Sequence, residues 1–216
     1  MERIMEPETV RRISLTKAKK LGYPVNSDLP LLGDIAIQRT QEELVDRMLC
    51  LFTCVACSFG LPKQLGWSWL AQEGLLEKVT PEESLYLRSK DESPVEKFQP
   101  HVETIWTLAW LAQVHDTLEF NQTCTNDMVS MFPNLKASAS SEAFRSKCQL
   151  RSVEEIAPKL DLAYCIHWAI QHETEHQLEL PKKPKRLRPY IIINRRHALE
   201  WLFCDEPWDE VPMDID

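Results

Sequence analysis

The sequence predicts a mainly α fold, with little or no strand, arranged as a single compact multi-helix domain. Three observations support this prediction: apolar residues recur at three- and four-residue spacings, two capping-box patterns occur, and no convincing strand alternation is present. The chain has 216 residues, of which 44% are hydrophobic and 27% charged, so it is long enough to bury a sizeable core. We therefore expect residues 1–216 to form one domain.

The first strong helical pattern covers residues 38–58. Its apolar positions follow the helical period and comprise Leu44, Met48, Leu51, Phe52 and Val55. The apolar stretch at residues 48–61 is shorter than the roughly 20 residues that a membrane-spanning helix needs. We therefore expect a buried helix and no membrane partner.

Two further segments complete the N-terminal half. Thr80-Pro81-Glu82-Glu83 has an N-cap residue, proline at the first helical position and glutamate at the third, which predicts a short helix. Residues 88–97 are charged and contain proline, which favours a loop. We expect a helix over residues 101–117, because tryptophans and aliphatic residues recur there with helical spacing.

The C-terminal third begins with a second capping box, from Ser152 to Glu155. Pro158 is expected to separate a short helix from a longer one over residues 159–176. Residues 179–190 form a basic, proline-rich connection, and residues 191–193 are either a short strand or the lead-in to a last helix at 195–204. Residues 205–216 form an acidic, irregular tail.

Charge and cysteine usage narrow the class of partner and the compartment. The formal net charge of -8 would repel a nucleic acid and attract a basic protein. Seven cysteines without paired spacing favour reduced thiols and a cytoplasmic protein. We therefore expect a protein partner, which is basic, and no nucleic acid; the sequence leaves the oligomeric state open.

The segment HETEH at residues 172–176 matches the His-Glu-x-x-His pattern of zinc peptidases. His172 and His176 would share a helix face as metal ligands, and Glu173 would act as general base. A third ligand is not evident, and the surrounding residues are polar, so a solvated helix end is the favoured interpretation. We expect no cofactor and no metal, and we keep a metal site at His172, Glu173 and His176 as the alternative.

Cysteine and tryptophan residues raise smaller questions. Cys50, Cys54 and Cys57 lie within the apolar helix at 38–58, where cysteine is usually a small core residue. Trp208 lies in the acidic tail beside Asp209. It must either fold back onto the body of the protein or remain exposed, so both residues are candidates for contact with a partner.

Spaced residues along most of the chain resemble the domain-of-unknown-function family 4272. The C-terminal part of this set comprises Arg151-Ser152, Glu154-Glu155-Ile156, Asp161-Leu162, Tyr164, His167-Trp168-Ala169, Arg195, Ala198-Leu199, Trp201-Leu202 and Trp208-Asp209-Glu210-Val211. Its upstream part includes Gly22-Tyr23-Pro24-Val25-Asn26, Leu29-Pro30, Gly60-Leu61-Pro62, Thr80-Pro81-Glu82-Glu83, Glu103, Trp106 and Trp110. The resemblance extends from about residue 11 to residue 214.

The resemblance implies no assigned activity, and it does not supply the zinc pattern. Similar proteins usually carry a polar stretch with arginine or aspartate where HETEH stands. This chain also departs from the family pattern at His101, Pro158-Lys159, Cys165 and Asn194, where charged residues are usual. These departures weaken the case for an intact catalytic set.

Four polar residues on otherwise apolar helices are candidates for a site: Glu103, Asp161, His167 and Arg195. The favoured interpretation is a buried network that fixes helix packing. The alternative is a pocket in which His167 acts as acid or base, oriented by Asp161 or Glu103.

Two classes of function are therefore predicted. The first is a non-enzymatic protein-binding module that captures a basic partner, for example as an immunity or antitoxin-like protein. The alternative is a metal-dependent hydrolase that uses the motif at residues 172–176.

Overall fold

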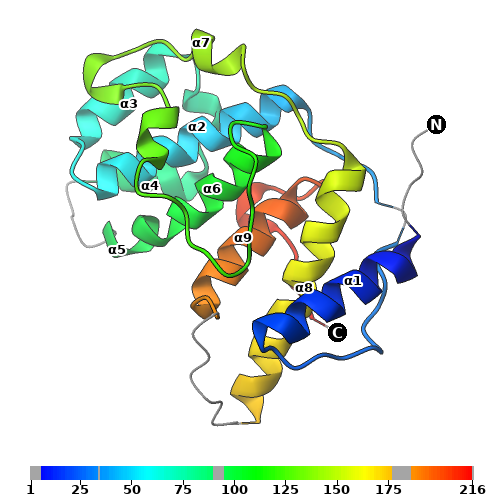
Figure 1. The fold of residues 1–216 in the computed structure, drawn as a ribbon. Coiled ribbons are helices and arrows are strands. Elements are labelled where there is room, and N and C mark those ends of the chain that lie inside the picture. The colour runs from blue at the N-terminus through cyan, green and yellow to red at the C-terminus, as the bar shows by residue number, and fades with distance from the viewer. Residues whose placement is uncertain (1–5, 34, 90–94, 177–185, 216) are drawn as a thin grey trace. The chain divides into compact units, whose positions relative to one another are not determined.

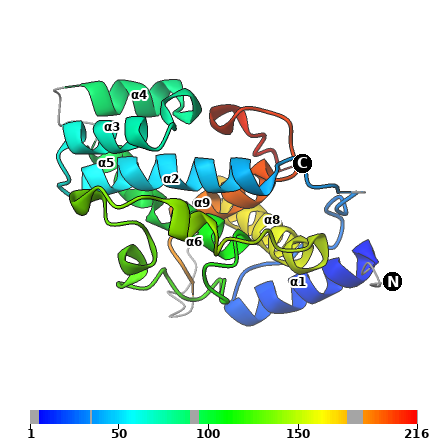
Figure 2. The ribbon, with the colours of Figure 1, turned by 90° about the horizontal axis from the view of Figure 1, so that it is seen from above.

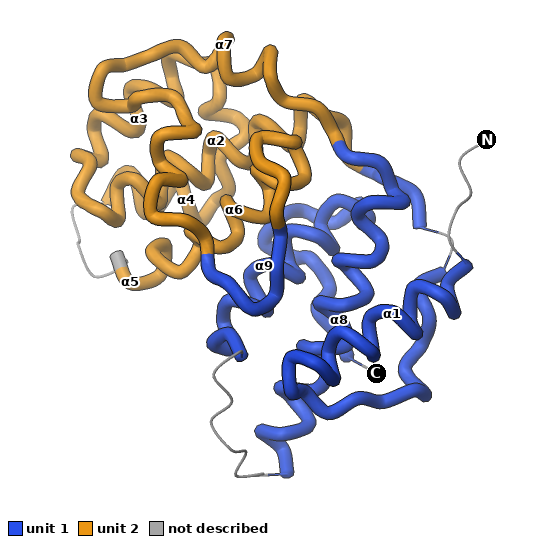
Figure 3. Tube along the Cα trace, in the orientation of Figure 1, with its two compact units in different colours: residues 1–38, 118–123, 151–216 blue, residues 39–117, 124–150 orange. Residues whose placement is uncertain are grey.

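The computed structural model describes residues 6–33, 35–89, 95–176 and 186–215, and these ranges contain helices and irregular segments but no strand. This confirms the predicted mainly α fold (Figure 1). The chain divides into two compact units (Figure 3): unit 1 comprises Met1–Gln38, Leu118–Thr123 and Arg151–Asp216, and unit 2 comprises Arg39–Thr117 and Cys124–Leu150. We describe each unit by itself, and the expectation of one domain stays a prediction.

Unit 1 is built around α8 (Val153–Glu175), which packs against α1 (Pro7–Leu21) and α9 (Pro189–Trp201). Figure 1 shows α1 lying alongside α8. The sequence did not predict α1. Its buried face consists of Val10, Arg11, Ser14 and Ala18, so only two of its four inward positions are apolar and the periodic signal is weak.

The long helix α8 corrects the expectation that Pro158 separates two helices. It runs without a break for 23 residues, with Pro158 inside it. Proline removes only the N–H that would bond to the carbonyl of Glu154, and Ile156 and Leu160 remain buried on either side. Packing therefore outweighs one lost backbone bond. The Ser152 capping box is confirmed, since its N–H donates to Glu155 Oε2 at 3.3 Å.

The last helix also differs from its expected bounds. Helix α9 begins at Pro189 rather than residue 195, because proline suits the first helical position, and it ends at Trp201 rather than 204. Residues 191–193 are helical, so they are part of the last helix and not a short strand. Most of the basic connection at residues 179–190 lies outside the described residues.

Unit 2 surrounds α2 (Gln41–Ser58), whose buried residues lie on almost every side. Figures 1 and 2 show α3 (Lys63–Gln72) and α6 (Val102–Leu111) beside it. The remaining elements are short: η1 (Leu76–Lys78), α4 (Pro81–Arg88), α5 (Val95–Phe98), η2 (Gln99–His101), η3 (Met128–Met131), η4 (Leu135–Ala137) and α7 (Glu142–Arg145).

The ends of these helices have local causes. The predicted capping box of α4 is present: the Thr80 N–H donates to Glu83 Oε2 at 3.0 Å, and the Glu83 N–H donates to Thr80 Oγ1 at 3.3 Å. The helix expected over residues 101–117 ends at Leu111, because Gln113 adopts a left-handed conformation with φ 55°. None of the described helices is long and apolar enough to cross a membrane.

Candidate functional site

The four polar candidates are placed in different surroundings. Asp161 and His167 lie six residues apart on α8 and are held by different arginines, Arg11 and Arg196. Arg195 lies on α9, and Glu103 belongs to unit 2, where its carboxylate accepts a hydrogen bond from the Cys124 N–H at 3.0 Å.

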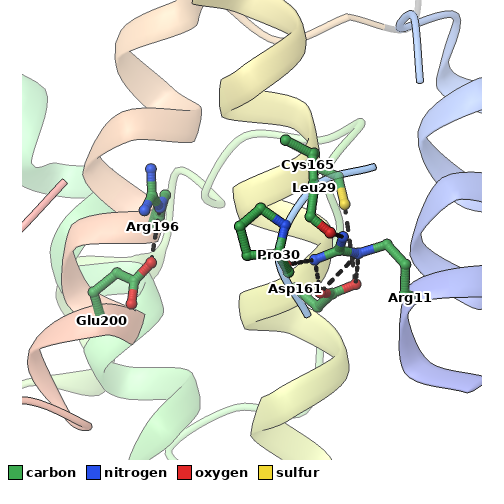
Figure 4. Close-up of polar contacts among 7 residues, drawn as sticks. All are labelled: Arg11, Leu29, Pro30, Asp161, Cys165, Arg196 and Glu200. Carbon is green, nitrogen blue, oxygen red and sulfur yellow. Dashed lines mark hydrogen bonds and ion pairs between the residues drawn. The ribbon is translucent and has the colours of Figure 1, made fainter. Parts of the chain in front are cut away.

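Asp161 forms a buried ion pair with Arg11 of α1 (Figure 4). The guanidinium donates to Asp161 Oδ1 from Nε at 3.1 Å and from Nη2 at 2.8 Å. It also donates to the carbonyl oxygens of Leu29 and Pro30, at 2.7 Å each. The side chains of Arg11 and Asp161 are 5% and 1% exposed, so the charges are screened little by water. This cluster fixes the irregular segment at 29–30 against α1 and α8.

His167 is held by Arg196 of α9. The Arg196 Nη1 donates to His167 Nδ1 at 2.9 Å, so Nδ1 is the unprotonated nitrogen and the imidazole is neutral. Burial and the positive charge of Arg196 lower the pKa of His167 from 6.5 to about 4. The pocket interpretation requires Asp161 or Glu103 to orient His167, but the arginine holds it instead.

Arg196 also connects α9 to the C-terminal tail. Its Nε donates to Glu200 Oε1 at 2.8 Å (Figure 4). Its two Nη atoms donate to the carbonyl oxygens of Met213 and Asp214, at 3.3 and 2.8 Å. Burial raises the pKa of the Glu200 carboxyl, and the adjacent guanidinium opposes that rise.

Two further arginines of unit 1 contact backbone carbonyls. Arg195 donates to Glu119 O at 2.5 Å and to Gln122 O at 2.8 Å. Arg186 donates to the carbonyl oxygen of Gly22 and contacts both oxygens of Glu173. We call these four side chains the arginine ties: Arg11, Arg186, Arg195 and Arg196.

Sequence reasoning missed three of the arginine ties, Arg11, Arg186 and Arg196. A signal for two of them exists in the helical spacing. Arg11 falls three and seven positions before Ser14 and Ala18 on the buried face of α1, and Arg196 falls four positions after the buried Ile192 of α9. An arginine on an inward helix face needs buried acceptors, but the sequence does not say which carbonyls supply them.

The HETEH segment forms the end of α8, with His176 as its C-cap. The Glu173 carboxylate, 10% exposed, pairs with Arg186 Nη1 at 2.8 and 3.0 Å. The rings of His172 and His176 lie 4.2 Å apart, and His176 Nδ1 donates to the His172 carbonyl at 2.8 Å. Both oxygens of the carboxylate that the zinc pattern would use as general base are therefore engaged by Arg186. No group of three or more metal-binding side chains occurs within the described ranges.

Trp208 folds back onto α9 and does not remain exposed in the tail. It is 8% exposed and packs edge-on against His197 and Trp201, with ring centroids 4.5 and 5.3 Å apart. Its neighbour Asp209 is exposed. Of the two, only Asp209 is exposed to solvent.

The cysteines of α2 are buried, as predicted. Burial raises the pKa of Cys50 and of Cys57 to about 12, and it also raises the pKa of Cys54. These thiols are therefore protonated at neutral pH, and thiolate chemistry is suppressed.

Each unit also contains a hollow. The hollow of unit 2, which we call the apolar groove, has a volume of about 520 Å³. It lies between the end of α2 and the segment at 129–136, which includes parts of η3 and η4. Its lining includes Phe52, Ala56, Phe59, Leu61, Val129, Phe132 and Leu135. Phe59 is 64% exposed and Val129 65% exposed, whereas Phe52 and Phe132 stack at 4.4 Å beneath the surface.

The hollow of unit 1, which we call the α8 cavity, has a volume of about 430 Å³. It lies between the start of α1, the segment around Leu32 and Gly33, and the first turns of α8. Most of its lining is aliphatic, and two carboxylates, Glu6 and Glu154, are part of it.

Comparison with known proteins identifies the family and no activity. No curated protein matches the chain. No solved structure matches it either. Residues 11–211 match a family described as a domain of unknown function (DUF4272), a range that covers most of the chain. The protein therefore belongs to the DUF4272 family.

Proposed function

We propose that the protein captures a basic protein partner without catalysing a reaction, and that the apolar groove of unit 2 is its anchoring surface. The observation that carries this proposal is the exposure of Phe59 and Val129 beside a preformed hollow. Apolar side chains that are about two-thirds exposed next to a groove are typical of protein interaction sites.

The groove can supply binding energy by burying those two side chains. Full burial of a phenylalanine or valine is worth about 1.5–3 kcal/mol each, and a partner side chain that enters the hollow adds its own burial. The stacked pair of Phe52 and Phe132 gives the groove a rigid floor, so little conformational entropy is lost on binding.

Charge supports a basic partner rather than an acidic one. The formal net charge of -8 attracts a cationic protein from a distance and accelerates its association. The groove itself is lined by one cation, Lys136, so the acidity acts over the whole surface rather than inside the groove. An immunity or antitoxin-like protein that neutralises a basic toxin has this combination of properties.

The contacts of the polar candidates favour this function over hydrolysis. The metal-dependent alternative needs Glu173 as a free base, and that carboxylate is held by Arg186. The alternative is tested directly by measuring zinc in protein purified without a histidine tag. About one zinc per chain, lost in a His172→Ala, His176→Ala variant, would replace the binding proposal with hydrolysis.

The binding proposal is tested by capture with a matched control. Cross-linked partners of the wild-type protein are identified by mass spectrometry and purified, and their affinities are compared with those of a Phe59→Asp, Val129→Asp variant. The control is Leu85→Asp, because Leu85 of α4 is 74% exposed and does not line the groove.

We expect the groove variant to bind the partner about 100-fold more weakly, and Leu85→Asp to bind as the wild type does. Association should slow with added salt, since a basic partner is steered by long-range charge. Equal affinity of both variants, or a partner that is acidic, would overturn the proposal.

A further inference from the structure

We propose that the α8 cavity of unit 1 is a second binding site, which takes the side chain of a lysine from a protein. This inference rests on the proposed function in its choice of source, a basic partner, but its chemistry is carried by the cavity alone. A volume of about 430 Å³ lies within the range of small-ligand pockets.

The walls of the cavity suit an alkyl chain. Seven aliphatic side chains from three segments line it: Pro7, Val10, Leu32, Ile35, Val153, Ala157 and Pro158. The four methylene groups of a lysine stem would lose contact with water against these walls, at about 0.8 kcal/mol per buried methylene.

Oxygen acceptors in the lining suit an ammonium group. The carboxylates of Glu6 and Glu154 are two of them. Pro158 has no N–H to donate to the Glu154 carbonyl, so the helix leaves that oxygen without its usual partner, and both residues line the cavity. We count that oxygen as the third acceptor. Three acceptors match the three N–H donors of a lysine ammonium.

The charge balance also favours a cation. The cavity adjoins the first turns of α1 and α8, whose helix dipoles place about half a positive charge at each N-terminus. The two carboxylates carry a full negative charge each, which exceeds that contribution. No lysine or arginine is among the described residues that line the cavity.

The test uses two probes and follows them by amide chemical shifts in the full-length protein. The first probe is Nα-acetyl-lysine methylamide, which presents a lysine side chain without backbone charge. The second is the norleucine analogue, which has the stem but no ammonium. We expect the lysine probe to shift the amides of the lining residues, and the norleucine probe to bind at least about tenfold more weakly.

Three variants locate the acceptors. Glu154→Gln and Glu6→Gln should each weaken binding of the lysine probe by about tenfold. The matched control is Glu8→Gln, because Glu8 is an exposed carboxylate in the first turn of α1 that does not line the cavity. It should leave binding unchanged.

Pro158→Ala tests the third acceptor, because alanine restores the N–H that bonds to the Glu154 carbonyl. We expect weaker binding of the lysine probe in this variant, with helix content by circular dichroism equal to or above that of the wild type. Binding as strong as in the wild type would remove the carbonyl from the site.

Other outcomes would overturn the proposal as a whole. These are equal binding of the norleucine probe, equal weakening by Glu8→Gln, or no shift in the lining residues at millimolar concentrations of the lysine probe. Binding of 1,6-diaminohexane more than about tenfold tighter than the lysine probe would assign the cavity to a free diamine instead. The groove variant should bind the lysine probe as the wild type does, so failure of either proposal is seen separately.

Discussion

The two units secure their irregular segments by different physical means. In unit 1 the arginine ties bind carbonyl oxygens of segments without regular structure, as Arg11 does at Leu29 and Pro30. In unit 2 the segment around Phe132 is held by rings: Phe132 stacks between Phe52 and Phe144, with centroids 4.4 and 5.2 Å apart. Polar contacts join in further along the chain, such as the bond from Trp69 Nε1 to the Ala139 carbonyl at 2.8 Å.

This difference shows how a segment can be fixed with or without directional bonds. A guanidinium can donate hydrogen bonds to several carbonyl oxygens at once. Its positive charge is then removed from water, so it also needs a negatively charged or other accepting partner nearby. Ring stacking needs no partner charge and tolerates small displacements. The segments held by the arginine ties of unit 1 should therefore be more sensitive than the ring-packed segment around Phe132 of unit 2 to the loss of a single polar atom and to pH.

The largest expected effect comes from removing the partner of a buried arginine. Asp161→Ala leaves the Arg11 guanidinium buried and unneutralised, and should lower the free energy of unfolding by about 3–5 kcal/mol in urea titrations. The double variant Arg11→Met, Asp161→Leu should cost less than the single one, since it removes both charges. A single variant that costs under about 1 kcal/mol would contradict the importance of the tie.

In unit 2 the matching change is Phe132→Ala. It removes a ring that is 7% exposed and stacked on two others, and should cost about 3 kcal/mol in the same titration. Phe132 lines the apolar groove, so partner binding should weaken as well. The stability loss should be the same at pH 5 and pH 7, because no charge is involved; a pH-dependent loss would remove the contrast with unit 1.

The third effect is the pH dependence of unit 1. The pKa of His167 is lowered from 6.5 to about 4, so an unfolded chain binds a proton in this range that the folded chain does not. The free energy of unfolding should therefore fall as the pH drops from about 6.5 to about 4. The full pKa shift sets an upper limit of about 3 kcal/mol, and the loss should be smaller than this because the ring is only half-buried.

The control for this effect is His167→Gln, which keeps an acceptor for Arg196 and does not titrate. Glu200, whose pKa is raised, contributes with the opposite sign in both proteins, so the difference between them isolates His167. Parallel stability curves for the wild type and the variant between pH 7 and pH 4 would show that His167 does not titrate as expected.

The smallest effect concerns the polar contacts of unit 2. Ser141 is buried and donates from Oγ to Glu73 Oε2 at 2.6 Å, while its Oγ accepts from Arg145 Nε at 2.9 Å. Ser141→Ala should cost about 1–2 kcal/mol in thermal or urea unfolding, because both partners are near solvent and can be rehydrated. A cost as large as that of Asp161→Ala would mean that this neutral contact matters as much as the buried ion pair of unit 1.

Local features of this fold could be predicted from the sequence, and distant contacts could not. The capping boxes at Thr80 and Ser152 were predicted because a cap and its glutamate lie three residues apart. Helix α1 was missed because half of its buried face is polar, and that polarity is meaningful only once Asp161 is placed 150 residues away.

At Pro158 a local sequence signal was overridden by packing. The predicted break at this residue was wrong: proline cannot donate to the Glu154 carbonyl, but the packing of Ile156 and Leu160 keeps the helix continuous. The motif at residues 172–176 has the spacing of a metal site, but its glutamate, Glu173, pairs with Arg186, a residue of the basic connection that follows. Spacing within a motif does not predict such a partner.

The order of segments in unit 1 has a consequence for folding during synthesis. Helix α1 leaves the ribosome before unit 2, whereas α8, against which it packs, follows only after most of unit 2 has been made. Arg11 must wait for Asp161, and the closure of that long loop costs less entropy once the intervening chain has become compact. The nearly continuous unit 2 is therefore expected to fold first and unit 1 last, when the final helices emerge.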